Sequence, residues 1–96
     1  MNSIDVRNLR NLIPNIKIID IRDNISFNRG CIPTAVNIPK NFLLMNASNY
    51  LNKNDTYYIY CEMGSNSKNV CLDLLSRGYK VVNIIGGYNS YKMLDY

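Results

Sequence analysis

The residue with the clearest chemical potential is Cys61, which lies between a strand-like segment and a helix-like segment. A side chain at the start of a helix lies near backbone N–H groups that have no partner within the helix. These donors and the positive end of the helix dipole favour thiolate over thiol, and the thiolate is the nucleophilic form. A polar loop over residues 62–66 could curl around the sulfur and add further N–H donors. The position therefore predicts a reactive sulfur, with a small buried hydrophobe as the alternative role.

Histidine is absent from the sequence, and no two cysteines form a C-x-x-C pair. These facts exclude a Ser-His-Asp or Cys-His nucleophile and zinc bound by histidine, and they argue against zinc-ribbon and thioredoxin-type motifs. Any nucleophile must therefore be activated without imidazole. Cys71 lies on an apolar helix face and is expected in the core. Cys31 is also expected to pack, with a second, resolving thiol as the alternative.

Strand-like and helix-like segments alternate along the chain. We predict strands over residues 17–21, 35–37, 57–60 and 81–85, and helices over residues 6–13, 24–29, 67–77 and from about 88 onward, with one or two short helices within 40–51. Asp5 is expected to cap the first helix, and Gly78 to follow the helix that begins near Ser67. This alternation predicts an α/β fold, with a mainly parallel sheet covered by helices on both faces. The functional crevice of such a sheet lies beyond the carboxyl ends of its strands.

The composition indicates one soluble globular domain of 96 residues. Eleven basic and seven acidic residues give a formal net charge of +4, which favours small anions or acidic proteins as partners. The basic residues are scattered singly, so nucleic-acid binding is not expected. The polar N-terminus resembles no signal peptide, and no apolar run is long enough to span a membrane. We therefore expect a cytoplasmic protein with reduced cysteines, and a monomer is the simplest assembly.

Several sequence blocks resemble the signatures of the rhodanese family. Residues 18–22 (IIDIR) and 30–39 (GCIPTAVNIP) are similar to its "DVR … GHIPGAxNIP" signature. Residues 58–67 (YIYCEMGSNS) resemble its "VVYCxxGxRS" active-site loop, and residues 74–79 (LLSRGY) and 86–91 (GGYNSY) resemble "LLxxxGY … GGxxAW". The blocks stand in the family's order and cover nearly the whole chain, so together they are far more specific than any one of them.

The resemblance implies a rhodanese-like three-layer domain over residues 1–96 and a sulfurtransferase activity. Cys61 would take sulfane sulfur from thiosulfate or a persulfide donor, hold it as a cysteine persulfide, and pass it to cyanide or a thiol acceptor, such as a thioredoxin-type protein. Asp20 and Arg22 would brace the active-site loop, whereas an ordinary surface ion pair would contribute at most ~1 kcal/mol. The loop residues that would bind the substrate are Glu62, Met63, Gly64, Ser65, Asn66 and Ser67. The implied reaction needs no metal and no organic cofactor.

Three positions depart from the family pattern. The pair Ser65-Asn66 stands where the family often has an arginine, so the loop has no cation of its own, and Cys31 replaces the usual histidine. Glu62 places a negative charge beside the sulfur, which would oppose an anionic donor by on the order of 1–4 kcal/mol. Lys68 is the candidate for a compensating cation. These departures argue against thiosulfate as the donor more than against persulfide chemistry on Cys61.

Two other functions compete with sulfur transfer. A cysteine phosphatase or arsenate reductase also cradles a thiolate at a helix start, but a phosphatase of this type needs a longer loop that ends in arginine. The sixth residue after Cys61 is Ser67, and no arginine follows Cys61 before Arg77, which argues against a phosphatase. The non-enzymatic alternative is a rhodanese-like interaction module or a thiol redox sensor. The retained Cys61 favours catalysis over that alternative.

Overall fold

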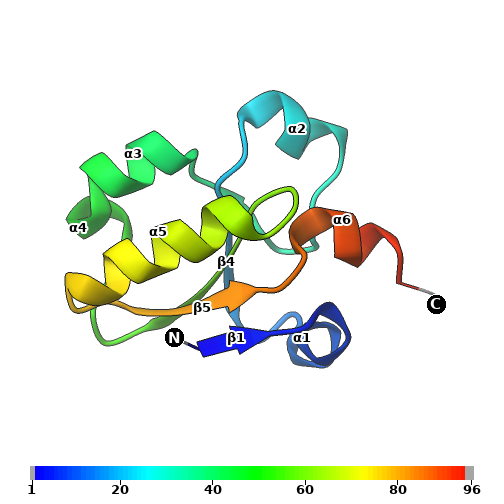
Figure 1. Ribbon diagram of the computed structural model, residues 1–96, viewed down its shortest axis with the longest axis horizontal. Coiled ribbons are helices and arrows are strands. Elements are labelled where there is room, and N and C mark those ends of the chain that lie inside the picture. Colours follow the sequence, from blue (N-terminus) through cyan, green and yellow to red (C-terminus); the bar gives the residue numbers. More distant parts are fainter. Residues whose placement is uncertain (1, 95–96) are drawn as a thin grey trace.

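The computed structural model describes residues 2–94, which form a three-layer α/β domain around one sheet (Figure 1). The five strands of the described residues lie in the order β1-β5-β4-β2-β3, and each neighbouring pair is parallel. They are β1 (Asn2–Ile4), β2 (Lys17–Asp20), β3 (Val36–Asn37), β4 (Thr56–Tyr60) and β5 (Lys80–Ile84). The parallel sheet expected from the sequence is confirmed, and its order places the carboxyl ends of β2, β4 and β5 side by side.

Helices cover both faces of this sheet, as expected (Figure 1). The helices of the described residues are α1 (Val6–Leu12), α2 (Asn24–Arg29), α3 (Lys40–Met45), α4 (Ala47–Tyr50), α5 (Ser65–Ser76) and α6 (Gly87–Lys92). The helices α3, α4 and α5 pack on one face, where they share a buried cluster with β2, β4 and β5. The helices α1 and α6 pack on the other face, in a second cluster. None of the helices in residues 2–94 is long and apolar enough to cross a bilayer.

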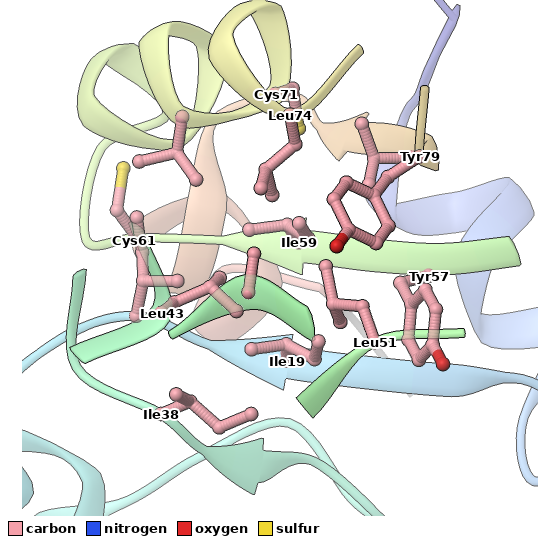
Figure 2. Packing of buried hydrophobic residues seen from close by; sticks show 14 residues of the cluster. Ile19, Ile38, Leu43, Leu51, Tyr57, Ile59, Cys61, Cys71, Leu74 and Tyr79 are labelled. Carbon is pink, nitrogen blue, oxygen red and sulfur yellow. The ribbon is translucent and has the colours of Figure 1, made fainter. Parts of the chain in front are cut away.

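The larger cluster reaches from the amino ends of the strands to the candidate nucleophile. Figure 2 shows Tyr57 and Tyr79 at one end of this cluster and Cys61 at the other. Cys71 lies between them on α5 with no exposed surface, so the prediction that it is a core residue is confirmed. Burial, with a smaller effect from the nearby Cys61, raises the pKa of the Cys71 thiol to about 12. Cys71 therefore stays protonated and is not a second nucleophile.

Capping and turn residues agree with the sequence at most element ends. The Asp5 carboxylate accepts a 2.8 Å hydrogen bond from the Asn8 N–H and caps α1, and Gly78 follows α5 with a φ of 93°. Asp23 caps α2 in the same way as Asp5, and its bonds to the backbone and side chain of Ser26 lower the pKa of that carboxyl.

Two differences from the expectation exceed one residue. The helix predicted to begin near Ser67 begins at Ser65, because Gly64 turns the chain with a left-handed φ of 102°. The strand β1 was not predicted, since its sequence Asn-Ser-Ile has no apolar pattern. It is an edge strand that pairs through its backbone with residues 82–84 of β5.

Candidate active site

The Cys61 side chain lies directly beyond β4, beneath the loop that leads into α5. Its sulfur accepts hydrogen bonds from the backbone N–H groups of Gly64, at 3.1 Å, and Ser67, at 3.3 Å. The left-handed turn at Gly64 bends the loop so that both donors point at the sulfur. The Ser67 hydroxyl oxygen lies 3.4 Å from the same sulfur, and Cys61 is only 5% exposed. The sulfur therefore lies in a cradle of backbone donors at the start of a twelve-residue helix.

The start of α6 holds the other side of this loop. The backbone N–H of Tyr88 donates to the Cys61 carbonyl oxygen, and that of Asn89 donates to the Glu62 carbonyl oxygen, both at 2.9 Å. Gly87 allows this contact, because its φ is 58° and a Cβ there would collide with the Cys61 carbonyl oxygen. The first N–H groups of α6, which have no partner within the helix, thus fix the backbone of the cysteine loop. The corresponding N–H groups at the start of α5 face the sulfur.

Arg22 lies at the centre of a buried ionic cluster behind the loop. Its guanidinium makes a forked contact with Asp20, with Nη2 2.8 Å from Oδ2 and Nε 3.1 Å from both oxygens. It also donates to the Gly30 carbonyl oxygen at 2.7 Å and to Glu62 Oε1 at 3.1 Å, and lies 4.4 Å from the Tyr88 ring centroid. Burial alone would lower the pKa of Arg22, but the bonds and charges of Asp20 and Glu62 outweigh it and raise that pKa. The side chains of Asp20 and Arg22 are 0% and 6% exposed, so this is not a surface ion pair.

Glu62 is turned toward Arg22 rather than left as an isolated charge beside the sulfur. Its Oε1 lies 3.1 Å from Arg22 Nη1, and its side chain is 47% exposed. The pairing and the contact with solvent both weaken the repulsion that Glu62 exerts on an anion near Cys61. We therefore expect this penalty near the lower end of the range of about 1–4 kcal/mol inferred from the sequence.

A cavity of about 360 Å³ opens over Cys61 at the carboxyl ends of β2 and β4. Two of its charged residues are positive, Arg22 and Lys40, and two are negative, Asp23 and Glu62. Its lining residues are Ile21, Arg22, Asp23, Ser26, Lys40, Cys61, Glu62 and Asn66. The cavity therefore offers a small ligand two charges of each sign around a buried sulfur.

Lys40, from the first turn of α3, is the cation that the sequence did not predict at this site. The candidate chosen from the sequence, Lys68, was wrong. It lines a different cavity together with Met63, Gly64 and Ser65. Lys68 and Asn66 both lie on the first turn of α5, but their side chains line different cavities, and only Asn66 lines the cavity over Cys61.

The six predicted loop residues divide into three groups. Glu62 and Asn66 line the cavity with Cys61, Met63, Gly64 and Ser65 line the separate cavity with Lys68, and Ser67 is fully buried beneath the sulfur. Asn83 was missed, although it lies 2.6 Å from the Ser67 hydroxyl oxygen and is 5% exposed. A lone polar residue within the apolar run of β5 was the signal that could have found it. No group of three or more metal-binding side chains is present among residues 2–94.

Comparisons with known proteins agree with this fold. The family model described as "Rhodanese-like domain" matches residues 5–94. The chain is similar to the putative sulfurtransferase YtwF of Bacillus subtilis, with 33% identity over 78% of this chain and 72% of that protein. It is also similar to a sulfurtransferase of Allochromatium vinosum, with 30% identity over 91% of this chain and 84% of that protein.

Solved structures give the same result. A crystal structure of a Staphylococcus saprophyticus protein superposes with a TM-score of 0.89 at 36% identity, and the alignment covers 100% of both chains. A rhodanese-like domain protein from Staphylococcus aureus superposes with a TM-score of 0.87 at 33% identity, over 95% of this chain and 91% of that one. The family match, the sulfurtransferase relatives and the shared fold together identify this chain as a member of the rhodanese-like domain family.

Proposed function

We propose that this protein transfers sulfane sulfur through a persulfide formed on Cys61. The observation that carries the proposal is the pair of backbone N–H donors, from Gly64 and Ser67, that point at a sulfur on the floor of a cavity. Such donors stabilise negative charge on sulfur without a histidine, and the sequence has no histidine. A relative of the chain at 31% identity, from Bacillus subtilis, is named as a putative sulfur carrier protein.

The reaction has two steps, and the second restores the free Cys61 thiolate. In the first, the Cys61 thiolate attacks the outer sulfur of the donor, a new S–S bond forms, and the donor's own bond breaks. With thiosulfate, the leaving group is sulfite, which departs with the electron pair of the broken bond. In the second step, cyanide or an acceptor thiolate attacks the terminal sulfur and takes it, and the Cys61 thiolate is released. No metal or organic cofactor takes part in either step.

The charges around the cavity support a persulfide as the better donor. Lys40 and Arg22 attract an anion, but Asp23 and Glu62 oppose it, and Arg22 is already engaged by Asp20. The lining residues therefore supply no net positive charge to offset the desolvation of a dianion such as thiosulfate. A persulfide carries less charge at its reacting end, so its desolvation in this cavity costs less. We propose a small persulfide or a protein persulfide as the donor, and a thiol, including that of a thioredoxin-type protein, as the acceptor.

The test is to incubate the protein with thiosulfate or with an organic persulfide, and to measure its intact mass and then thiocyanate after addition of cyanide. We expect a mass increase of one sulfur atom with both donors, formed faster with the persulfide. A Cys61→Ser variant is the control. An adduct from neither donor would contradict the proposed function, and a faster reaction with thiosulfate would contradict the donor preference.

Removing the charge of Glu62 is expected to improve the use of thiosulfate. In Glu62→Ala, a negative charge leaves the cavity wall and Arg22 Nη1 loses its partner, so it can face the anion. We expect the KM for thiosulfate to fall about 3- to 10-fold, as a change of about 1 kcal/mol produces. Steady-state kinetics at low ionic strength measure it.

Two matched variants separate the effects of Glu62. Glu62→Gln removes the charge but keeps an acceptor for Arg22, so its effect on the KM should be smaller than that of Glu62→Ala. Lys40→Met removes a cation from the same cavity and should raise the KM. A KM that is unchanged in Glu62→Ala would show that Glu62 does not limit the binding of the anion.

A further inference from the structure

A pair of buried polar side chains lies behind the Cys61 sulfur, on the side away from the cavity. Ser67, on α5, has no exposed surface, and Asn83, on β5, is 5% exposed. The Ser67 hydroxyl oxygen lies 2.6 Å from Asn83 Oδ1 and 3.4 Å from Cys61 Sγ. Asn83 thus reaches the sulfur through one hydroxyl group, although 22 positions of the chain separate it from Cys61.

The number of hydrogens available to Cys61, Ser67 and Asn83 fixes which group donates to which. A serine hydroxyl has one hydrogen to donate, and the short contact to Asn83 Oδ1 is its nearest acceptor, with the Gly64 carbonyl oxygen at 3.1 Å as the other. The Ser67 oxygen is then free to accept the hydrogen of the Cys61 thiol. The order of donation, from Cys61 to Ser67 to Asn83, is that of a neutral sulfur.

An anionic sulfur requires the opposite order. A thiolate or a persulfide anion has no hydrogen to give to Ser67, and a serine lone pair facing it would be repulsive. If the Ser67 hydroxyl turns toward the sulfur, it adds a third donor to the two backbone N–H groups. Asn83 Oδ1 then loses its donor. A carboxamide can repair that loss by a half-turn that presents its NH₂ group to the Ser67 oxygen.

We propose that Asn83 is a positioning residue that reverses its hydrogen bond to Ser67 whenever the Cys61 sulfur changes between its neutral and anionic forms. This deepens the proposed function and rests on it, because sulfur transfer needs the same pocket to hold a thiol, a thiolate and a persulfide. No side chain without both a donor and an acceptor could serve both arrangements. Asn83 touches Ser67 and not the sulfur, so it acts through the serine.

The test is the pH profile of Cys61 alkylation by iodoacetamide, followed by peptide mass mapping so that Cys31 does not interfere. Asn83→Asp has an acceptor-only side chain that keeps the Ser67 hydroxyl away from the sulfur and adds a negative charge behind it. We expect the pH of half-maximal rate to rise by about one unit or more. The persulfide should form about 10-fold more slowly at pH 7, with an unchanged KM for the donor.

A second substitution separates this role from a structural one. Asn83→Leu has neither donor nor acceptor, so it leaves the Ser67 hydroxyl free to turn to the sulfur. We expect the midpoint of its alkylation profile to stay or to move to lower pH. A loosened loop would instead move both variants in the same direction, and that result would overturn the proposal. Asn15→Asp adds the same charge at the opposite end of the sheet, before β2, and should leave the profile unchanged.

The proposal stays testable if Asn83→Asp does not fold. Ser67→Ala removes the third donor to the anion, so its midpoint should rise by about half a unit or more. An unchanged midpoint in Ser67→Ala would overturn the proposal. The charged and titratable groups around the sulfur and Asn83 are the same in all these variants: Arg22, Asp23, Lys40 and Glu62 around the cavity over Cys61, Lys68 in the cavity that Asn83 lines, and Cys71 in the core. Alkylation uses no sulfur donor, so its result is independent of whether the protein transfers sulfur.

Discussion

In the Cys61→Ser variant, we expect sulfur transfer to fall by at least about 1,000-fold, as is usual when a covalent nucleophile is lost. The serine hydroxyl can accept the same hydrogen bonds from the Gly64 and Ser67 N–H groups, so the loop should keep its shape. A hydroxyl is a far weaker nucleophile toward sulfur than a thiolate, and it cannot hold a persulfide. Thiocyanate formation and intact mass after incubation with a donor measure the effect.

Two controls make this result specific to Cys61. Cys31→Ser changes the other cysteine with exposed surface, and it should keep both the adduct and the thiocyanate. Near-wild-type thermal unfolding of Cys61→Ser would show that the loss is chemical. Sulfur transfer that survives in Cys61→Ser would overturn the assignment of the nucleophile. Loss of transfer in Cys31→Ser would instead show that a second thiol takes part.

Arg22→Met is expected to cause the largest loss of stability, about 3–5 kcal/mol of the free energy of unfolding. Asp20 has no exposed surface, and in this variant its carboxylate keeps a backbone N–H donor but loses its buried countercharge. The variant also removes the hydrogen bond from Arg22 to Glu62, in the cysteine loop, and the one to the Gly30 carbonyl oxygen, in the segment after α2. Since domains of this size have about 5–15 kcal/mol in total, urea unfolding will detect the change readily.

A surface ion pair provides the matched control for Arg22. Arg77 and Asp73 lie on one helix face with side chains 39% and 41% exposed, and Arg77→Met should cost less than about 1 kcal/mol. Adding Asp20→Asn to Arg22→Met removes the unpaired buried charge and should recover part of the loss. Equal costs for Arg22→Met and Arg77→Met would contradict the bracing role proposed for Arg22.

The elements that carry the site could be read from local sequence. The β-branched run before Asp20 and the aromatic run before Cys61 predicted two strands, and both end within one residue of the expectation. These predictions succeed because burial on a parallel strand demands a continuous apolar run of a few residues, and such a run is visible without any partner. The start of α5 was misplaced by two residues, because the left-handed turn at Gly64 ends the loop early. The edge strand β1 was not predicted, because it forms by backbone pairing with β5 and its own sequence has no strand pattern.

The chemistry proposed for Cys61 rests on local sequence too, since a cysteine between a strand and a helix meets backbone donors without helical partners wherever that unit folds. What surrounds the sulfur depends on which strands become neighbours. The order β5-β4-β2 brings Asn83 behind Ser67, and the pairing of β2 with β4 puts Lys40 and Arg22 at the cavity over Cys61. These residues lie 21 to 39 positions from Cys61 along the chain. Side chains so distant in sequence meet only through tertiary packing, so their charges and hydrogen bonds could not be assigned to the sulfur before the fold was known.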